Sequence, residues 1–204
     1  MVFWLLLLGN WSNQLTNKTF ARALPKNGAI CVFKKFIMPY SKAVKDKTKW
    51  FIDTYGEGIA QAIKGTGLYF PAVIAQKALE SGWGNSELSR LHNNWGGIKC
   101  APKLEGAVGC VKMDTTEWTK SGKKYATKQN FTKFRDTKSG FKAHMQVLMA
   151  DRYKNARDNA KSAKEQIKMI AAAGYTTGKP NEYLSSMAGI IEAAQDYSGL
   201  GRIH

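Results

Sequence analysis

The spacing of apolar residues changes along this chain, and the change limits the folds it can adopt. Before residue 80 and after residue 140 they recur at three- and four-residue steps, which is typical of amphipathic helices. Between residues 98 and 134 they alternate with polar residues in short runs, which favours strands. The pattern predicts an α+β fold that is mainly helical, with a small β lobe of one or two hairpins placed after Glu80.

Two helices are expected before the β segment. The first begins near Ser41 and ends at the stretch "KGTGLYF", and Gly56 and Gly58 weaken it. Pro71 fits the first turn of the second helix, where the missing N–H of proline has no partner to lose. After the β segment, three apolar stripes predict further helices. Ser139 and Asn181 are the expected N-caps and Gly174 is an expected C-cap.

The first 37 residues differ from the rest of the chain. The run "VFWLLLLG" is too short to span a bilayer. It also lacks the preceding positive charge and the clear cleavage site of a secretory signal. This N-terminal extension, 1–37, is therefore interpreted as a poor signal, a surface tether or an unfolded segment, with a translation start at Met38 as a further alternative. Residues 38–204 are expected to form one domain.

The charge balance points to a polyanionic partner. The chain has 31 Lys and Arg against 15 Asp and Glu, a formal net charge of +16. Nucleic acid, anionic lipid and the acidic polymers of a bacterial wall would all be attracted to such a surface. Nucleic acid is disfavoured because the basic residues are dispersed and no recognition motif appears. A non-catalytic basic polyanion-binding module is the alternative from a different class.

Cysteine and histidine do not indicate a metal or cofactor. Three cysteines are too few for a disulfide scaffold, and none has the CxxC spacing of a zinc site. Cys100 and Cys110 flank a short loop, so they either form a disulfide in an oxidising compartment or remain free thiols. The three histidines are scattered, and we predict neither a metal site nor a cofactor.

Glu80 is the most informative acid, because it ends an apolar helical run in the stretch "ALESGWG". A helix C-terminus disfavours a negative charge by about 0.3–1 kcal/mol, which corresponds to less than one pKa unit. Burial must supply any larger shift, and Trp83 and Trp95 could form the apolar wall of a general acid. On these residues alone, a solvated helix end is the simpler interpretation.

The order and spacing of several motifs favour the catalytic interpretation. "AQKALESGWGNS", "NNWGGIKC", "TTEW", "FRDTKSGF" and "AGYTTGKPNEYLSSMAGIIE" together resemble the glucosaminidase-domain family of bacterial peptidoglycan hydrolases. That family includes flagellar muramidase-like enzymes, autolysins and phage lysins. The resemblance implies a lysozyme-like helical body with a β-hairpin lobe flanking a substrate cleft. It also implies a monomer that acts on glycan strands, either outside the cell, in the envelope, or from the host cytoplasm before lysis.

The resemblance assigns roles to individual residues. Glu80 matches the essential acid, and Glu117 matches the proposed second carboxylate, whose role is disputed. Tyr183 matches a tyrosine beside the cleft. Asn94 and Trp95 fall in a segment that usually continues with Phe-Gly, where this chain has Gly96. Trp83, Asn94, Trp95 and Tyr183 are therefore candidate substrate-binding residues, with core packing as the alternative for the aromatic ones and an exposed strand position as the alternative for Glu117.

The expected reaction is hydrolysis of the β-1,4 bond after N-acetylglucosamine by an endo-β-N-acetylglucosaminidase. A muramidase or a lytic transglycosylase on the same fold is the enzymatic alternative. A separation of about 5–5.5 Å between the two carboxyls would indicate a retaining route, and roughly 6.5–9.5 Å an inverting one. A more remote Glu117 would point to assistance from the 2-acetamido group of the substrate.

Overall fold

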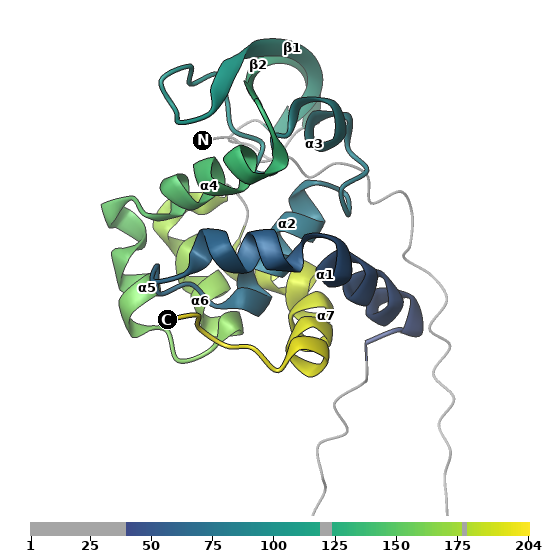
Figure 1. The fold of residues 1–204 in the computed structure, drawn as a ribbon, viewed down its shortest axis with the longest axis vertical. Coiled ribbons are helices and arrows are strands. Elements are labelled where there is room, and N and C mark those ends of the chain that lie inside the picture. Colours follow the sequence, from purple (N-terminus) through teal and green to yellow (C-terminus); the bar gives the residue numbers. More distant parts are fainter. Residues whose placement is uncertain (1–39, 119–123, 177–178) are drawn as a thin grey trace, which may run out of the picture. The chain divides into compact units, whose positions relative to one another are not determined.

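A computed structural model of the chain describes residues 40–118, 124–176 and 179–204 (Figure 1). For residues 116–118 and 124 it describes the backbone alone. The expected extension 1–37, Cys31 and most of the predicted hairpin turn "KSGKK" lie outside the described residues.

The described residues form a helical body with one β hairpin, which confirms the predicted fold class. The hairpin follows α3 and precedes α4, so it is inserted after Glu80 as expected, and Figure 1 shows it at one end of the helical body. The helices are α1 (Lys42–Ile63), α2 (Phe70–Glu80), α3 (Glu87–His92), α4 (Thr137–Leu148), α5 (Lys154–Asn159), α6 (Ala163–Ile170) and α7 (Pro180–Ser198). Two short elements complete the body: the 3₁₀ turn η1 (Asp151–Tyr153) and the π-helical turn η2 (Ala171–Tyr175).

α2 is the central helix of the body. Every residue from Phe70 to Ala78 is buried, and Pro71 lies in its first turn as predicted. α1, α6 and α7 pack against it, and apolar residues from all four helices share one core. A helix that is buried on all sides needs no polar face, so the polar residues within it require an explanation of their own.

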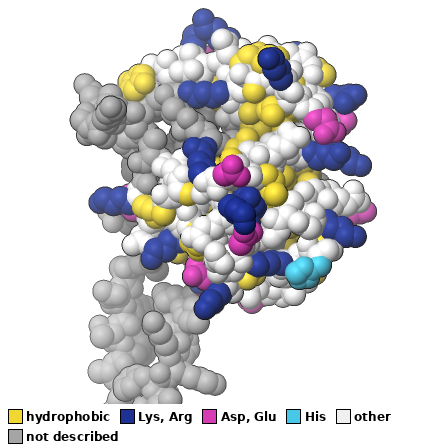
Figure 2. Space-filling model, turned by 90° about the vertical axis from the view of Figure 1, so that its left-hand side faces the viewer, with side chains coloured by type: hydrophobic (Ala, Val, Ile, Leu, Met, Phe, Trp, Pro, Cys, Tyr) yellow, Lys and Arg dark blue, Asp and Glu magenta, His cyan; other side chains and the backbone are white. Residues whose placement is uncertain are grey.

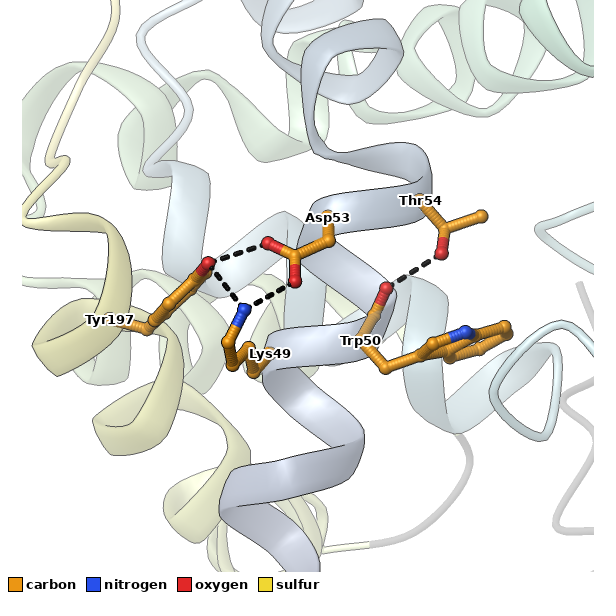
Figure 3. A network of polar contacts seen from close by, with 5 residues as sticks. All are labelled: Lys49, Trp50, Asp53, Thr54 and Tyr197. Carbon is orange, nitrogen blue, oxygen red and sulfur yellow. Dashed lines mark hydrogen bonds and ion pairs between the residues drawn. The ribbon is translucent and has the colours of Figure 1, made fainter.

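α1 and α7 are joined by polar contacts as well as by the core. The Asp53 carboxylate accepts hydrogen bonds from Lys49 Nζ and from the Tyr197 hydroxyl, both at 2.6 Å. Lys49 Nζ also donates to the Tyr197 hydroxyl at 2.9 Å (Figure 3). Trp50 points away from this network in the same view. Because the three groups are exposed, the network contributes little to stability and mainly orients the last helix.

The helix caps differ from the predictions. Asp136, not Ser139, caps α4, because its carboxylate accepts the backbone N–H of Ser139 at 2.7 Å. Lys179 precedes α7, and Asn181 lies inside the helix after Pro180. Proline already fits the first helical position, so no side-chain cap is formed there. Gly174 has a left-handed backbone, with a φ of +84°, but it lies inside η2, which ends at Tyr175 with Thr176 as its C-cap, so the predicted C-cap is one residue before the end of this element.

The hairpin consists of β1 (Ala107–Trp118) and β2 (Lys124–Phe134), paired antiparallel. The segment before β1 runs along the other edge of β2, since Cys100 N donates to the Asn130 carbonyl and Thr132 N to that of Ile98. Cys100 and Cys110 form a disulfide, so of the two alternatives the structure has the paired one. A second buried cluster packs the hairpin against α4, and it consists of Ile98, Phe134 and Ala143.

Candidate active site

Glu80 is the last residue of α2 and emerges at the end of the buried helix. Most of the surface of Glu80 is covered by protein, and part of it remains exposed. Burial raises the pKa of Glu80 to about 8, and the Tyr183 hydrogen bond and the Lys77 charge only partly oppose it. Burial is therefore the dominant cause, as the sequence argument required, and the carboxyl is mostly protonated at neutral pH.

The turn after Glu80 explains the sequence "SGWG". Gly82, Trp83 and Gly84 all have left-handed backbones, with φ of 56°, 61° and 78°. Glycine adopts this conformation readily, whereas a tryptophan there carries strain of order 1–3 kcal/mol. The Ser81 hydroxyl accepts the N–H of Gly84 at 2.8 Å and stabilises the turn. A strained residue three positions after a buried acid is typical of a functional site.

Tyr183 contacts the carboxyl directly from α7. Its hydroxyl donates to Glu80 Oε1 at 3.3 Å and accepts from Gln76 Nε2 at 3.4 Å. The side chain is only 5% exposed, which leaves little of its surface for a ligand. Sequence reasoning expected this tyrosine beside the substrate, and the structure shows its hydroxyl against the acid.

Behind Glu80 lies a buried polar chain that sequence reasoning missed. Lys77 Nζ lies 2.6 Å from His144 Nδ1, and His144 Nε2 lies 2.6 Å from the Tyr175 hydroxyl. The Tyr175 ring lies 6.0 Å from the Tyr183 ring, which brings the chain back to the acid. The available signal was a lysine inside the otherwise apolar run "VIAQKALE".

Asn94 and Trp95 belong to the scaffold of the site. The Asn94 amide donates to the carbonyls of Ile98 and Thr132, at 2.8 and 2.9 Å, and its oxygen accepts the N–H of Ile98. The Trp95 side chain is 3% exposed, with its ring 4.7 Å from that of Tyr55. This placement favours core packing over sugar contact for both residues. Trp83 is half-buried, with its ring 6.0 Å from the Phe51 ring. It follows Glu80 by three residues and part of its surface is exposed.

Gly96 is explained by the residue opposite it. A Cβ atom at this position would lie 2.7 Å from His144 Cγ, closer than any ordinary contact. Glycine is therefore needed because the His144 ring packs onto the backbone at position 96. Gly96 and the buried His144 ring therefore form one packing unit in this chain.

Glu117 lies on β1, with its backbone paired to Tyr125, one pair before the last pair of the two strands. Its side chain, and with it the carboxyl separation from Glu80, lies outside the described part of the chain. Among the described residues, no group of three or more His, Cys, Asp or Glu side chains could hold a metal ion. No helix within the same residues is long and apolar enough to cross a membrane.

A helical body, a two-stranded hairpin and a buried acid at the end of the central helix define a lysozyme-like glycoside hydrolase fold. The catalytic domain of the autolysin Auto from Listeria monocytogenes has this architecture. It matches with a TM-score of 0.61 and 29% identity, covering 73% of this chain and 85% of that one.

The glucosaminidase family model, described as mannosyl-glycoprotein endo-beta-N-acetylglucosaminidase, matches residues 56–196, and the chain belongs to this family. The resemblance drawn from the motifs is thereby confirmed. Peptidoglycan hydrolase FlgJ of Pseudomonas aeruginosa is 28% identical over 132 residues, covering 63% of this chain and 32% of that protein. Exo-glucosaminidase LytG of Bacillus subtilis is 30% identical over 153 residues, covering 72% and 51%. The chain thus spans about a third to a half of these curated relatives.

Proposed function

We propose that the protein hydrolyses peptidoglycan at the β-1,4 bond after N-acetylglucosamine, with Glu80 as the general acid and no cofactor. The observation that carries the proposal is a carboxyl with a pKa of about 8 at the end of α2, hydrogen-bonded by Tyr183. Family membership and the peptidoglycan hydrolase FlgJ as a relative support the substrate class.

The geometry supports a defined proton path. Because the Tyr183 hydroxyl donates to Oε1, the carboxyl proton is carried by Oε2. Glu80 transfers this proton to the glycosidic oxygen as the bond to the sugar breaks, so that the leaving group departs as a neutral alcohol. The carboxylate that forms is then stabilised by the Tyr183 hydrogen bond.

A second group must stabilise the oxocarbenium-like transition state or activate water. Glu117 is proposed for this role from the family resemblance and from its place on the hairpin that follows Glu80. If Glu117 acts as base or nucleophile, replacing it with Gln abolishes turnover. If the substrate's acetamido group acts instead, the same replacement leaves most of the activity.

The basic surface is proposed to bring the enzyme to anionic wall polymers, in the envelope, outside the cell or during phage lysis, as a monomer. Figure 2 shows Lys and Arg side chains spread over the face in view, with acidic ones between them, rather than gathered in one stripe. Removing several lysines together should therefore weaken wall binding at low salt, where the attraction between charges is least screened. Unchanged binding at low salt would reject this targeting role.

Digestion of purified peptidoglycan by the wild type and by Glu80→Gln tests the function. The products are reduced with borohydride and their new ends are identified by mass spectrometry. Reduced N-acetylglucosamine ends that vanish in the variant support both the bond and the acid. Reduced muramic ends would instead identify a muramidase, anhydro-muramic ends a transglycosylase, and no products at all a non-catalytic polyanion-binding module.

A further inference from the structure

The fully buried Lys77 is the group in this fold that the proposed reaction does not yet use. It lies on α2, three residues before Glu80, a spacing that puts both side chains on one face of the helix. Lys77 and His144 both have 0% of their surface exposed. A lysine is almost never fully buried unless it is paired, and the partner here is an imidazole rather than a carboxylate.

The charge state of Lys77 determines which atoms of this chain carry protons, and the inference takes Lys77 as the ammonium. A lysine ammonium has three donors and no acceptor, so His144 Nδ1 accepts the bond from Lys77. The neutral imidazole then carries its proton on Nε2 and donates it to the Tyr175 oxygen at 2.6 Å. The ammonium also lies 5.2 Å from the centroid of the Phe141 ring, a distance at which cation–π attraction applies.

Stability alone does not explain this arrangement. Removing a charge from water carries a large desolvation penalty, and replacing buried charged groups with apolar ones is often neutral or stabilising. The chain nevertheless accommodates the pair by keeping glycine at position 96, where any Cβ would meet the His144 ring. A buried cation retained next to a buried acid points to a role in the chemistry of that acid.

We infer that Lys77, held in place by His144 and Tyr175, is a positioning residue for Glu80: its charge favours the carboxylate that remains when Glu80 gives up its proton. The inference rests on the proposed function, in which Glu80 is the acid. Without the lysine, burial would act on the carboxyl against the Tyr183 hydrogen bond alone. The acid would then release its proton to the substrate less readily.

The groups that face this pair come from several elements. Lys77 lies on α2 with Glu80, and burial holds the pKa of Lys77 well below its ordinary value, which the charge of Glu80 only partly opposes. A charged Lys77 in turn lowers the pKa of Glu80. His144 on α4 has a pKa well below its usual value because it is buried and next to Lys77. Tyr175 of η2, Tyr183 of α7 and Tyr153 of η1 are buried phenols, and the pKa values of Tyr175 and Tyr183 are raised by burial, which keeps both neutral. Lys77 is thus the group that can supply positive charge to Glu80 from within this set.

The decisive experiment is a carbon-13 NMR titration of the Glu80 carboxyl in the full chain, assigned with Glu80→Gln. The wild type is compared with Lys77→Met, which keeps the length of the side chain and removes its charge. We expect the Glu80 midpoint to rise by at least about one pH unit in the variant. The alkaline limb of peptidoglycan hydrolysis should move in the same direction. Lys49→Met, which removes an exposed lysine of α1, should change neither.

A purely structural lysine would give another result. Lys77→Met would then lower the melting temperature and leave the Glu80 midpoint in place, which would overturn the inference. If that variant does not fold, Lys77→Met combined with His144→Phe removes both partners together, and the same shift is expected. The wild-type tautomer is a further check by nitrogen-15 NMR, because a proton on His144 Nδ1 would mean a neutral Lys77 and would also reject the inference.

The two proposals fail separately. A wild type that releases no sugar ends from peptidoglycan would reject the proposed function, while the NMR titration would still decide the coupling of Lys77 to Glu80. If Lys77→Met hydrolyses peptidoglycan with the alkaline limb of the wild type, and its Glu80 midpoint is unchanged, the proposed function stands and the role of Lys77 is rejected.

Discussion

The hydroxyl of Tyr183 lies 3.3 Å from Oε1 of Glu80, so a residue of the last helix holds an acid that ends the second. Gln76, one turn earlier on α2, donates to the same hydroxyl. The tyrosine hydroxyl is thereby directed at the carboxyl, with its proton pointing to Glu80. α7 contributes to the site through this bond, and its orientation depends on its packing against α1 and α2.

Tyr183→Phe should slow hydrolysis more than it destabilises the fold. The variant keeps the buried ring but loses the bond that stabilises the Glu80 carboxylate, so the pKa of Glu80 should rise further. A hydrogen bond to a charged group contributes about 1.5–3 kcal/mol, which corresponds to a roughly 10- to 100-fold loss of turnover. Initial rates on peptidoglycan from pH 5 to 10 measure the loss of turnover and the rise in the pKa of Glu80.

Tyr197→Phe is the matched control, because it removes a hydroxyl of the same helix that bonds Asp53 and Lys49 instead (Figure 3). Its rates should equal those of the wild type. Equal losses in the two variants would mean that the hydroxyls act by holding α7 in place, and not by contacting the acid.

Activity should decline as pH rises through about 8, because Glu80 must be protonated to act and its pKa has that value. Reaction rates on peptidoglycan across this pH range measure the decline.

Glu80→Gln should also change the dependence of stability on pH. The folded state holds the Glu80 proton up to about pH 8, whereas the unfolded chain releases it near its ordinary value of 4.5. Ionisation of Glu80 therefore lowers the free energy of unfolding between these two values.

Urea denaturation of wild type and variant at pH 5 and pH 9 measures this difference. The wild type should lose stability relative to Glu80→Gln as pH rises, because only the wild type buries a new negative charge. A constant difference between the two proteins across this range would show that the pKa of Glu80 is not raised in the folded state.

Local sequence patterns predicted much of the fold, and they predicted Glu80 as the acid of the site. The helical period and Pro71 predicted α2 up to Glu80, since adjacent residues determine helix formation and termination. The buried chain behind the acid was not predictable in this way. Lys77 and His144 are 67 residues apart, and His144 and Tyr175 are 31 apart, so no local spacing brings them together.

Asn94 shows a different limit of sequence reasoning. A polar residue in a motif beside the acid can hydrogen-bond either the substrate sugar or the protein backbone, and the sequence looks the same in both cases. Only the three-dimensional path of β2 decides, because it brings the Thr132 carbonyl within 2.9 Å of the Asn94 amide. The same holds for Trp95, whose ring meets Tyr55 and Phe141 from two distant helices.

The Cys100–Cys110 disulfide should stabilise the base of the hairpin. The two residues are separated by 10 positions, and closing a loop of this size in the unfolded chain contributes about 2–3 kcal/mol. The double variant Cys100→Ser, Cys110→Ser should lower the free energy of unfolding by that amount, measured by denaturation under oxidising conditions. A reducing agent should bring the wild type to the same stability and leave the variant unchanged. If the reducing agent destabilises both proteins equally, the effect does not come from this pair.

Gly96→Ala should destabilise the protein by about 1–3 kcal/mol, because the new methyl group would lie 2.7 Å from His144 Cγ within a packed interior. The loss should depend on the histidine. In the background of His144→Ala the ring is absent, so the same glycine replacement should have little further effect, and the two changes should be strongly non-additive. Chemical denaturation of the four proteins of this cycle measures the coupling. Additive losses would mean that the glycine is needed for its backbone alone, and that the histidine and the glycine are not one packing unit.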